Sequence, residues 1–247
     1  MSDPPAGTER ILHPPIKAVT FDFWGTLYEN GTDRTSRYLQ VLAAALPGFA
    51  DDELSAAFHS AEQMASDVGR LGFRLCVPGR VAVMLDNLGT SLPPEPRRRL
   101  VLALENVVLE MPPPLVEGVS GVLATLRDRG YALGLISDTG MAPGRVMREL
   151  MQRDGVAHFF QHLTFSDELG VTKRWPQAFR STCMALGVAP EETLHVGDLP
   201  ETDIRTGKVA GLHTALATYV SHRYDGAKDA DLVLSRLTEL PDMLARL

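Results

Sequence analysis

Four short segments of the sequence carry acidic, hydroxyl and basic residues of the kinds used in phosphoryl chemistry. In chain order these residues are Asp22 in FDFWGTL, Ser137 in SDTG, Lys173 in VTKRWP, and Asp198 with Asp203 in GDLPETD. The set provides a carboxylate nucleophile, further carboxylates that suit a hard divalent cation, and hydroxyl and ammonium donors for phosphate oxygens. Such chemistry requires that four segments distant in the chain meet in one place.

Each of these segments follows a run that predicts a buried strand. Residues 16–23, IKAVTFDF, are apolar and β-rich, and the comparable later runs are YALGLIS, HLTFS and TLHVGD. Amphipathic helical patterns alternate with these runs and with two further ones, HTALAT and DLVLS. This alternation predicts an α/β fold, a doubly wound parallel sheet with helices on both faces. Because active sites of such sheets lie at the carboxyl ends of the strands, we expect one crevice there.

Residues 28–115 interrupt the alternation with helical patterns only. The four patterns are separated by breaks at Pro47–Gly48, Pro78–Gly79 and Pro93–Pro94. We therefore expect an all-helical insertion at 28–115, with residues 16–27 and 116–247 forming the α/β core. Residues 1–15 are polar and Pro-rich, and we expect a flexible N-terminal arm.

Composition restricts the function classes. The formal net charge of −7 argues against non-specific binding to nucleic acid or to anionic lipid. Cys76 and Cys183 form neither a CxxC pair nor a secreted disulfide framework. The sequence contains no signal-peptide pattern and no apolar run of the roughly 18 residues that a membrane helix needs. We expect a cytoplasmic monomer or homodimer that acts on a small, anionic molecule, without nucleic-acid or membrane partners.

The four segments resemble, in order and spacing, the four motifs of the haloacid dehalogenase superfamily of hydrolases, and the resemblance runs from residue 16 to about 245. It implies a Rossmann-like core. The helical insertion resembles the small helical cap that subfamily I of this superfamily, with its C1-type cap, places after the first strand. The resemblance also implies hydrolysis of a small phosphorylated metabolite through an aspartyl intermediate, dependent on Mg²⁺.

The resemblance assigns catalytic roles to three residues. Asp22 would be the nucleophile, Ser137 would donate to the transferred group, and Lys173 would neutralise charge on nucleophile and substrate. Plainer roles are open for the last two, since serine can cap a helix and most lysines lie on surfaces. Asp138 can likewise cap the next helix. The residues implied to shape or contact the phosphate site are Trp24, Gly25, Thr26, Asp138 and Thr139.

The resemblance also implies a Mg²⁺ site. Asp198 would bind the ion together with Asp22 and the backbone carbonyl of Trp24. Asp203 would either support the metal shell or hold Lys173. Two acids that flank a turn can also be helix caps, especially with a proline at the likely first helical position.

Trp24 departs from the pattern of the family phosphatases, which carry a second Asp at this position to protonate the leaving oxygen. An indole can donate a hydrogen bond but cannot act as an acid or base near neutral pH. General acid–base catalysis typically raises the reaction rate by about 10²- to 10⁴-fold. Four interpretations are open: a leaving group that needs no proton, such as an acyl or aryl phosphate; another acid such as His59, Glu29 or a residue of the insertion; carbon–halogen hydrolysis without metal; or a non-catalytic ligand-binding or partner-binding protein. The GDxxxxD segment favours phosphate chemistry, because the family dehalogenases work without metal and have a different fourth motif.

Two further groups of residues have an open role. Arg174 and Trp175 follow Lys173, where relatives usually have proline, and either contact an anionic or aromatic substrate or belong to an ordinary surface loop. Arg70, Arg74 and Arg80 lie in GRLGFRLCVPGR within the insertion. One of them could meet the substrate as the insertion closes over the site, and the alternative is a solvated face.

Overall fold

A six-stranded parallel sheet forms the centre of the molecule. The computed structural model describes residues 15–245, so residues 1–14 of the expected arm and residues 246–247 lie outside the described range. The strand order is β3-β2-β1-β4-β5-β6, and every neighbouring pair is parallel. The strands are β1 (Ala18–Phe21), β2 (Ala132–Ser137), β3 (His162–Phe165), β4 (Thr193–Gly197), β5 (His213–Ala217) and β6 (Leu232–Leu234). The parallel α/β sheet predicted from the sequence is confirmed.

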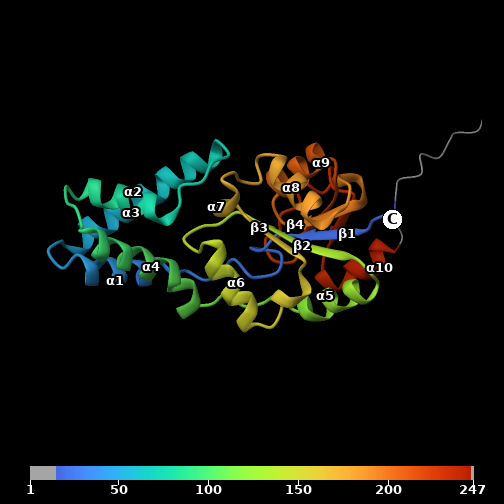
Figure 1. Cartoon of the computed structure of the whole chain (residues 1–247), viewed down its shortest axis with the longest axis horizontal. Helices are drawn as coiled ribbons and strands as arrows, with labels where there is room; N and C mark the ends of the chain where they lie inside the picture. Colours follow the sequence, from blue (N-terminus) through green and yellow to red (C-terminus); the bar gives the residue numbers. More distant parts are fainter. Residues whose placement is uncertain (1–14, 246–247) are drawn as a thin grey trace, which may run out of the picture.

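Helices cover both faces of the sheet (Figure 1). One face packs on α5 (Val119–Asp128), α6 (Gly144–Arg153) and α10 (Leu240–Leu244), and the other on α8 (Gln177–Leu186) and α9 (Arg205–Ala210). The shorter segments are α7 (Ser166–Leu169), the 3₁₀ turns η1 (Ala157–Phe159), η2 (Pro190–Glu192) and η4 (Leu237–Glu239), and the π-helical turn η3 (Pro200–Ile204). Because both faces are covered, the central strands β1 and β4 are buried along their whole length rather than at alternate residues.

The position of β1 explains why the chemistry gathers at one edge. All four residues of β1 are buried, and the strand pairs with β2 on one side and β4 on the other. The register places Phe21 beside Leu135 of β2 and Val196 of β4. The backbone N–H of Asp22 continues the pairing, donating to the carbonyl of Val196 at 2.8 Å. The residues that follow these three strands therefore emerge side by side.

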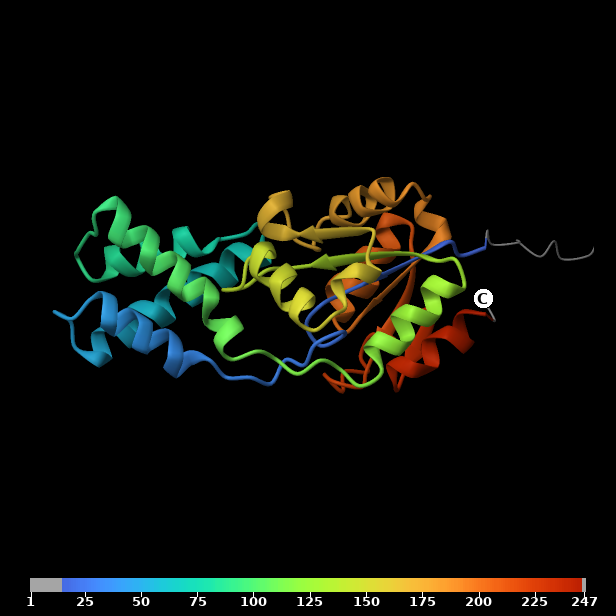
Figure 2. The same ribbon diagram turned by 60° about the horizontal axis from the view of Figure 1, so that its bottom comes forward.

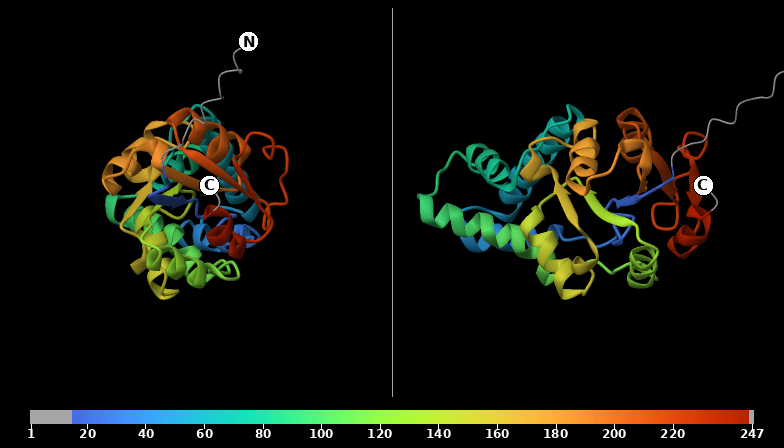
Figure 3. Two further views of the ribbon diagram at one scale, coloured as in Figure 1. Left: turned by 90° about the vertical axis from the view of Figure 1, so that its right-hand side faces the viewer. Right: turned by 45° about the vertical axis from the view of Figure 1, so that its right-hand side comes forward.

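The helical insertion contains four helices between β1 and β2: α1 (Thr35–Ala45), α2 (Asp51–Arg70), α3 (Val77–Asn87) and α4 (Pro94–Glu110). Figures 2 and 3 show them beyond the carboxyl ends of the strands, next to the core rather than on a face of the sheet. They enclose a separate apolar cluster that includes Leu42, Leu54, Met84 and Leu104. The insertion thus has its own apolar cluster, to which Met141 of the segment after β2 also contributes.

Helix α2 illustrates how the sequence specifies these helices. Its first turn holds Asp51, Asp52 and Glu53, which suit the positive end of the helix dipole, and Glu53 accepts the N–H of Ala50 at 2.8 Å. Its buried face recurs at helical spacing and comprises Leu54, Ala57, Phe58, Ala61 and Ala65.

One predicted break is misplaced. Pro78 and Gly79 lie inside the first turn of α3. Proline is tolerated there because the backbone N–H groups of a first helical turn have no partner within the helix, so the missing N–H of proline costs nothing. The chain leaves helical geometry instead at residues 71–76. Among residues 15–245, no helix is long and apolar enough to cross a membrane.

Candidate active site

The acidic and basic residues predicted from the four segments meet at the carboxyl ends of β1, β2 and β4. Asp22 directly follows β1, Ser137 ends β2, and Asp198 directly follows β4. Lys173 comes from the loop after α7, and Asp203 from η3. Each of these side chains is nearly or completely excluded from solvent. The structure therefore brings together all five residues with which the sequence argument begins.

Lys173 joins the nucleophile candidate to the last carboxylate of the set. Its Nζ lies 2.5 Å from Asp22 Oδ1 and 2.6 Å from Asp203 Oδ1, and only 2% of Lys173 is exposed. Burial alone would lower the pKa of Lys173, but the charges of Asp203 and Asp22 outweigh burial and raise it. The lysine is therefore a permanent cation beside Asp22, and a surface role for it is excluded.

Asp203 has both carboxylate oxygens engaged. Its Oδ1 accepts from Lys173 and from His195 Nε2 at 3.1 Å, while its Oδ2 accepts the backbone N–H of Leu199 at 2.9 Å. Burial raises the pKa of Asp203, but the neighbouring Lys173 and His195 outweigh burial and hold that pKa well below its usual range. These contacts favour the role of holding Lys173 over that of a direct metal ligand.

His195 is a site residue that none of the four segments predicts. It lies fully buried in β4, where its Nδ1 is 2.9 Å from the hydroxyl of Thr20. Because Nε2 faces the carboxylate of Asp203, the proton is assigned to Nε2, and Nδ1 accepts from Thr20. Burial lowers the pKa of His195, which keeps the ring neutral. The available signal was a histidine in TLHVG, a run that predicts a buried strand, since a buried polar group needs partners.

Asp198 lies over the turn that follows β1. Gly25 in this turn has φ of +75°, a left-handed conformation that favours glycine, and a Cβ on it would collide with the carboxylate of Asp198. Burial and the charge of Asp203 raise the pKa of Asp198 to about 6. The predicted turn-forming role of Gly25 has a concrete cause here, because the turn leaves room for this carboxylate.

The carboxylate cluster fits a divalent cation. Oxygen atoms of Asp22, Asp198 and Asp203 lie within 4.8 Å of one another, and all three residues are buried. Three carboxylates against the single ammonium of Lys173 leave an excess of negative charge away from water, which a hard cation with oxygen ligands would offset. Burial together with Asp203 and Asp198 raises the pKa of Asp22, although Lys173 acts in the opposite direction. Among the described residues, no backbone N–H donates to the carbonyl of Trp24, so this oxygen is also open to a cation.

The residues after β2 divide into two environments. The Oγ atom of Ser137 has one long contact, 3.4 Å to the carbonyl of Asp138, and so keeps a donor for a ligand. Asp138 accepts the backbone N–H of Lys173 at 2.9 Å, and burial raises its pKa. Thr139 is committed elsewhere, because its N–H donates to the hydroxyl of Ser166 at 2.9 Å and the two hydroxyls lie 3.2 Å apart. Ser166, which begins α7, is a further residue beside this segment that the four sequence segments do not predict.

The turn after β1 contains Trp24 and Thr26. The indole of Trp24 is half-buried and packs edge-on against Phe23, with ring centroids 4.8 Å apart. Thr26 is fully buried, and its carbonyl accepts from the hydroxyl of Tyr219 at 3.0 Å. Its own Oγ1 meets no hydrogen-bond partner among residues 15–245. The hydrogen-bonding capacity of this buried hydroxyl is thus unused within the described residues.

Neither candidate for a replacement acid is buried. His59 is exposed on α2, with Nδ1 2.7 Å from the carbonyl of Ser55 in the same helix. Glu29 is exposed as well, and its backbone N–H donates to the carbonyl of Pro114 at 3.0 Å. Neither side chain is enclosed with Asp22 in this structure.

The helical insertion contacts the core beside Lys173. The N–H of Thr172 donates to the carbonyl of Gly72 at 3.1 Å, and Phe73 forms an antiparallel bridge with Val171. The indole of Trp175 lies against Gly72. The break after α2 is therefore docked on the loop that carries Lys173, on the side of the molecule where Figure 1 shows α2 approaching α7.

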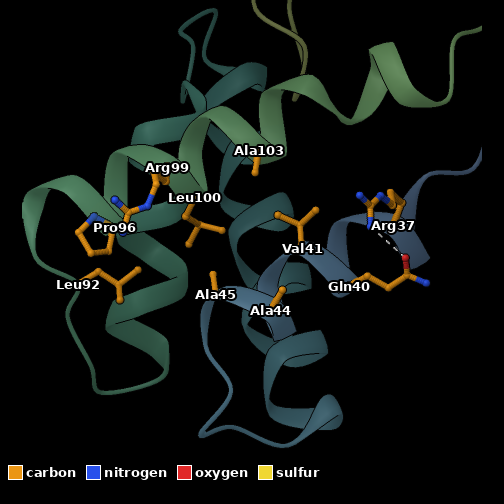
Figure 4. Close-up of a pocket in the computed structure, with 10 residues that line it drawn as sticks. All are labelled: Arg37, Gln40, Val41, Ala44, Ala45, Leu92, Pro96, Arg99, Leu100 and Ala103. Atoms are coloured by element: carbon orange, nitrogen blue, oxygen red, sulfur yellow. Dashed lines mark hydrogen bonds between the residues drawn. The ribbon is translucent and has the colours of Figure 1, made fainter.

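A separate groove of about 440 Å³ lies within the insertion, between α1 and α4. Figure 4 shows apolar side chains such as Val41 and Leu100 at its base and the guanidinium groups of Arg37 and Arg99 at its edge. None of its lining residues belongs to the carboxylate cluster. We assign it no part in the chemistry at Asp22.

Sequence comparison relates this chain to known hydrolases. A sequence model of haloacid dehalogenase-like hydrolases matches residues 16–211. A glyceraldehyde 3-phosphate phosphatase of Methanopyrus kandleri is 28% identical over 81% of this chain and 82% of its own length. A phosphoserine phosphatase of Thermus thermophilus is 35% identical over 51% of this chain, which spans about half of that relative.

Solved structures share the fold. A 2-haloacid dehalogenase of Pseudomonas syringae aligns with a TM-score of 0.73 and 21% identity, over 94% of this chain and 99% of its own. A phosphatase of Thermococcus onnurineus aligns with a TM-score of 0.63 and 22% identity, over 93% and 98%. With the match to the family, the sheet topology and the buried Asp22–Lys173 pair, the conclusion is direct: this chain belongs to the haloacid dehalogenase-like hydrolases.

Proposed function

We propose that this protein is a Mg²⁺-dependent phosphatase that hydrolyses phosphate monoesters of small metabolites through a covalent intermediate on Asp22. The observation that carries the proposal is the buried contact of 2.5 Å between Asp22 Oδ1 and Lys173 Nζ, beside the carboxylates of Asp198 and Asp203. A carboxylate nucleophile, a fixed cation and a cluster suited to a divalent ion are the parts that phosphoryl transfer uses.

In the proposed reaction, a carboxylate oxygen of Asp22 attacks phosphorus, and the bond from phosphorus to the ester oxygen breaks. Lys173 balances negative charge on Asp22 and on the phosphoryl oxygens, and the hydroxyl of Ser137 donates to one of those oxygens. Water then attacks the phosphorus of the aspartyl phosphate, which releases inorganic phosphate and restores the carboxylate of Asp22. Mg²⁺, held by Asp22, Asp198 and the carbonyl of Trp24, would supply further positive charge opposite the phosphoryl oxygens.

Trp24 sets the expected preference for the leaving group. Because its indole gives no proton, departure is easiest for a group that is stable as an anion, such as an aryl or acyl oxygen. The relatives are named for several phosphorylated metabolites, among them glyceraldehyde 3-phosphate, phosphoserine and phosphoglycolate. These names support a small phosphorylated substrate and differ too much to select one. We further propose that the helical insertion, residues 28–115, acts as the cap over this site.

The second candidate is carbon–halogen hydrolysis through an ester of Asp22. Trp24 is the observation that favours it, since halide leaves without a proton. Two observations favour phosphate esters over halides: the sequence relatives are named phosphatases, and the buried carboxylate cluster calls for a cation that halide displacement does not need. The dehalogenase similarity rests on fold at 21% identity.

The test is activity against p-nitrophenyl phosphate and 2-chloropropionate, each with and without Mg²⁺. We expect nitrophenol release that depends on Mg²⁺ and falls to background in Asp22→Asn, and no chloride release. Asp33→Asn is the matched control, because Asp33 carries an acid of the same size whose side chain hydrogen-bonds only locally, to the backbone N–H of Thr35. Chloride release without metal would replace the proposal by dehalogenation. Nitrophenol release that persists in Asp22→Asn would remove Asp22 as the nucleophile.

A further inference from the structure

Three arginines close in sequence lie in three different environments. Arg70 is exposed and pairs with Asp67 on the same helix. Arg80 is buried, where it pairs with Glu62 and donates from Nε to the carbonyl of Leu75 at 3.1 Å. Arg74 lies between them on the segment that follows α2. Its Nε and Nη2 atoms are buried, and neither meets a hydrogen-bond acceptor anywhere in the described range 15–245.

An arrangement of this kind is costly for a guanidinium. The group has five N–H donors and a permanent charge, and a buried donor left without an acceptor loses its hydration without replacement. Burial and the nearby charge of Arg80 lower the pKa of Arg74 to about 10, so the side chain is still a cation at neutral pH. The charge of Asp138 acts in the opposite direction and raises the pKa of Arg74. The carboxylate of Asp138, however, accepts its hydrogen bond from the backbone N–H of Lys173 and not from Arg74. The positive charge of Arg74 is thus not matched by a partner of its own.

The position of Arg74 relates it to the active site. A Cβ placed on Gly140 would lie 3.9 Å from Arg74 Nη2, and Gly140 closes the SDTG segment at the end of β2. Two residues before Arg74, the carbonyl of Gly72 accepts the N–H of Thr172, which immediately precedes Lys173. This docking contact therefore ties the segment that carries Arg74 to the loop that carries Lys173.

We propose that Arg74 binds a second anionic group of the substrate, a carboxylate or a second phosphate, on the part of the molecule that leaves. This rests on the proposed phosphatase function and names the substrate class more closely: phosphate monoesters whose leaving group is itself an anion. The planar fork of arginine matches two oxygens of such a group, and a buried charge-assisted pair is stronger than an exposed one. The ligand would supply the acceptors that Arg74 lacks.

The experiment compares two substrates that differ by a single carboxylate, phenyl phosphate and 3-carboxyphenyl phosphate. Both lose an aryl oxygen, so the missing acid at Trp24 affects them alike. We expect the wild type to prefer the carboxylated ester in kcat/KM, and Arg74→Gln to reduce that preference by about 10- to 100-fold. Arg74→Lys should restore part of it, because the charge is kept and the fork is lost. Arg70→Gln is the matched control and should keep the full preference.

Two further measurements separate this proposal from its alternatives. If Arg74 served only to hold the fold, Arg74→Gln would lower the unfolding midpoint and reduce kcat/KM equally for both esters. We expect an unchanged or raised midpoint, because the substitution removes a charge whose Nε and Nη2 are buried without acceptors among the described residues. Calorimetry with phenylphosphonate and 3-carboxyphenylphosphonate measures the same difference as binding. A wild type that hydrolyses neither ester would contradict the proposed function, while the phosphonates would still test Arg74. A carboxylate preference that is absent from the wild type, or unaffected by Arg74→Gln, would overturn the inference.

Discussion

Lys173 and Asp203 form an ion pair of 2.6 Å that is shielded from water and fixed from three sides. Asp203 accepts from Lys173, from the ring of His195 and from the N–H of Leu199, so its carboxylate has little freedom to rotate. Lys173 therefore reaches Asp22 from a rigid base. Charges that are in place before the reaction need no reorganisation as the transition state forms, which is the main advantage of such a site.

Replacing Lys173 with Met should be costly for both activity and stability. Removal of the cation leaves Asp22 and Asp203 as uncompensated buried acids. We expect the free energy of unfolding to fall by about 3 to 5 kcal/mol and turnover of p-nitrophenyl phosphate to fall by about 100-fold or more. Urea unfolding and steady-state kinetics measure the two effects.

The matched control is Lys17→Met. Lys17 also forms an ion pair, with Glu192 at 2.6 Å, but 58% of its side chain is exposed. Pairs of this kind contribute about 1 kcal/mol or less. If the two lysine variants lost similar amounts of stability, the buried cluster would not have the strength that we assign to it.

Asp198 should make the stability of the metal-free protein depend on pH. Burial and Asp203 raise its pKa from 3.8 to about 6, so the folded state binds the proton more tightly than the unfolded state. The stability that this group contributes is fully present below pH 3.8 and is lost as the pH rises through about 6. Between pH 7.5 and pH 5 we expect Asp198 to add about 1 kcal/mol to the free energy of unfolding.

Urea unfolding at the two pH values, with EDTA present, compares the wild type with Asp198→Asn. The variant should lack this increment, because asparagine does not titrate. Mg²⁺ at pH 7.5 should stabilise the wild type and have a much smaller effect on the variant, since the ion takes the place of the proton. An identical pH dependence in both proteins would show that Asp198 is not the titrating group, and equal stabilisation by Mg²⁺ would place the ion elsewhere.

The sequence was sufficient where the position of a residue in the fold follows from its place on a strand. Asp22 and Asp198 come directly after apolar runs. Parallel pairing brings the ends of β1 and β4 together independently of the conformation of the loops. The position of Asp203 after β4 could not show whether it supports the metal shell or holds Lys173. That choice depends on distances between elements, which the sequence does not give. His195, the partner of Asp203, could not be predicted for a related reason. The hydrogen bond between them joins a strand residue to a residue of the following turn, and the residue pattern of β4 carries no sign of that contact.

Loop docking was the other feature beyond sequence analysis. The pattern gave Arg70, Arg74 and Arg80 the same description, three cations near a break. The structure separates them by their partners, since Arg70 and Arg80 have acids within reach and Arg74 has none for its Nε and Nη2 among the described residues. The misplaced break at Pro78 shows the same limit. A proline is compatible with a loop and with the first turn of a helix, and tertiary contacts decide between them.

Trp24→Asp should add the proton donor that the site lacks. We expect hydrolysis of an alkyl ester such as ethyl phosphate to rise by about 100-fold, while hydrolysis of p-nitrophenyl phosphate changes much less, because nitrophenolate leaves without a proton. The ratio of the two kcat/KM values is the quantity to measure. Trp24→Asn removes the same indole and supplies no acid, so it should leave the ratio near that of the wild type. A similar rise in both variants would attribute the gain to added space instead.

Gly72→Ala should weaken the contact between the insertion and the core. Gly72 has φ of +84°, and a Cβ on it would collide with the indole of Trp175. The collision displaces the segment that carries Arg74 from the loop that carries Lys173. Because small displacements of catalytic groups are costly, we expect kcat/KM for 3-carboxyphenyl phosphate to fall about tenfold or more.

Gly89→Ala separates this collision from backbone strain. Gly89 also lies in the insertion and has φ of +60°, but a Cβ on it would meet nothing within 4 Å. Backbone strain should lower the stability of both variants by about 1 to 2 kcal/mol, because alanine is strained in the left-handed region. The collision with Trp175 should add to this loss in Gly72→Ala. Only Gly72→Ala should also lose activity. If Gly89→Ala lost as much activity, general loosening of the insertion would explain the effect. The docking of Gly72 on Thr172 and Trp175 would then have no specific part in activity.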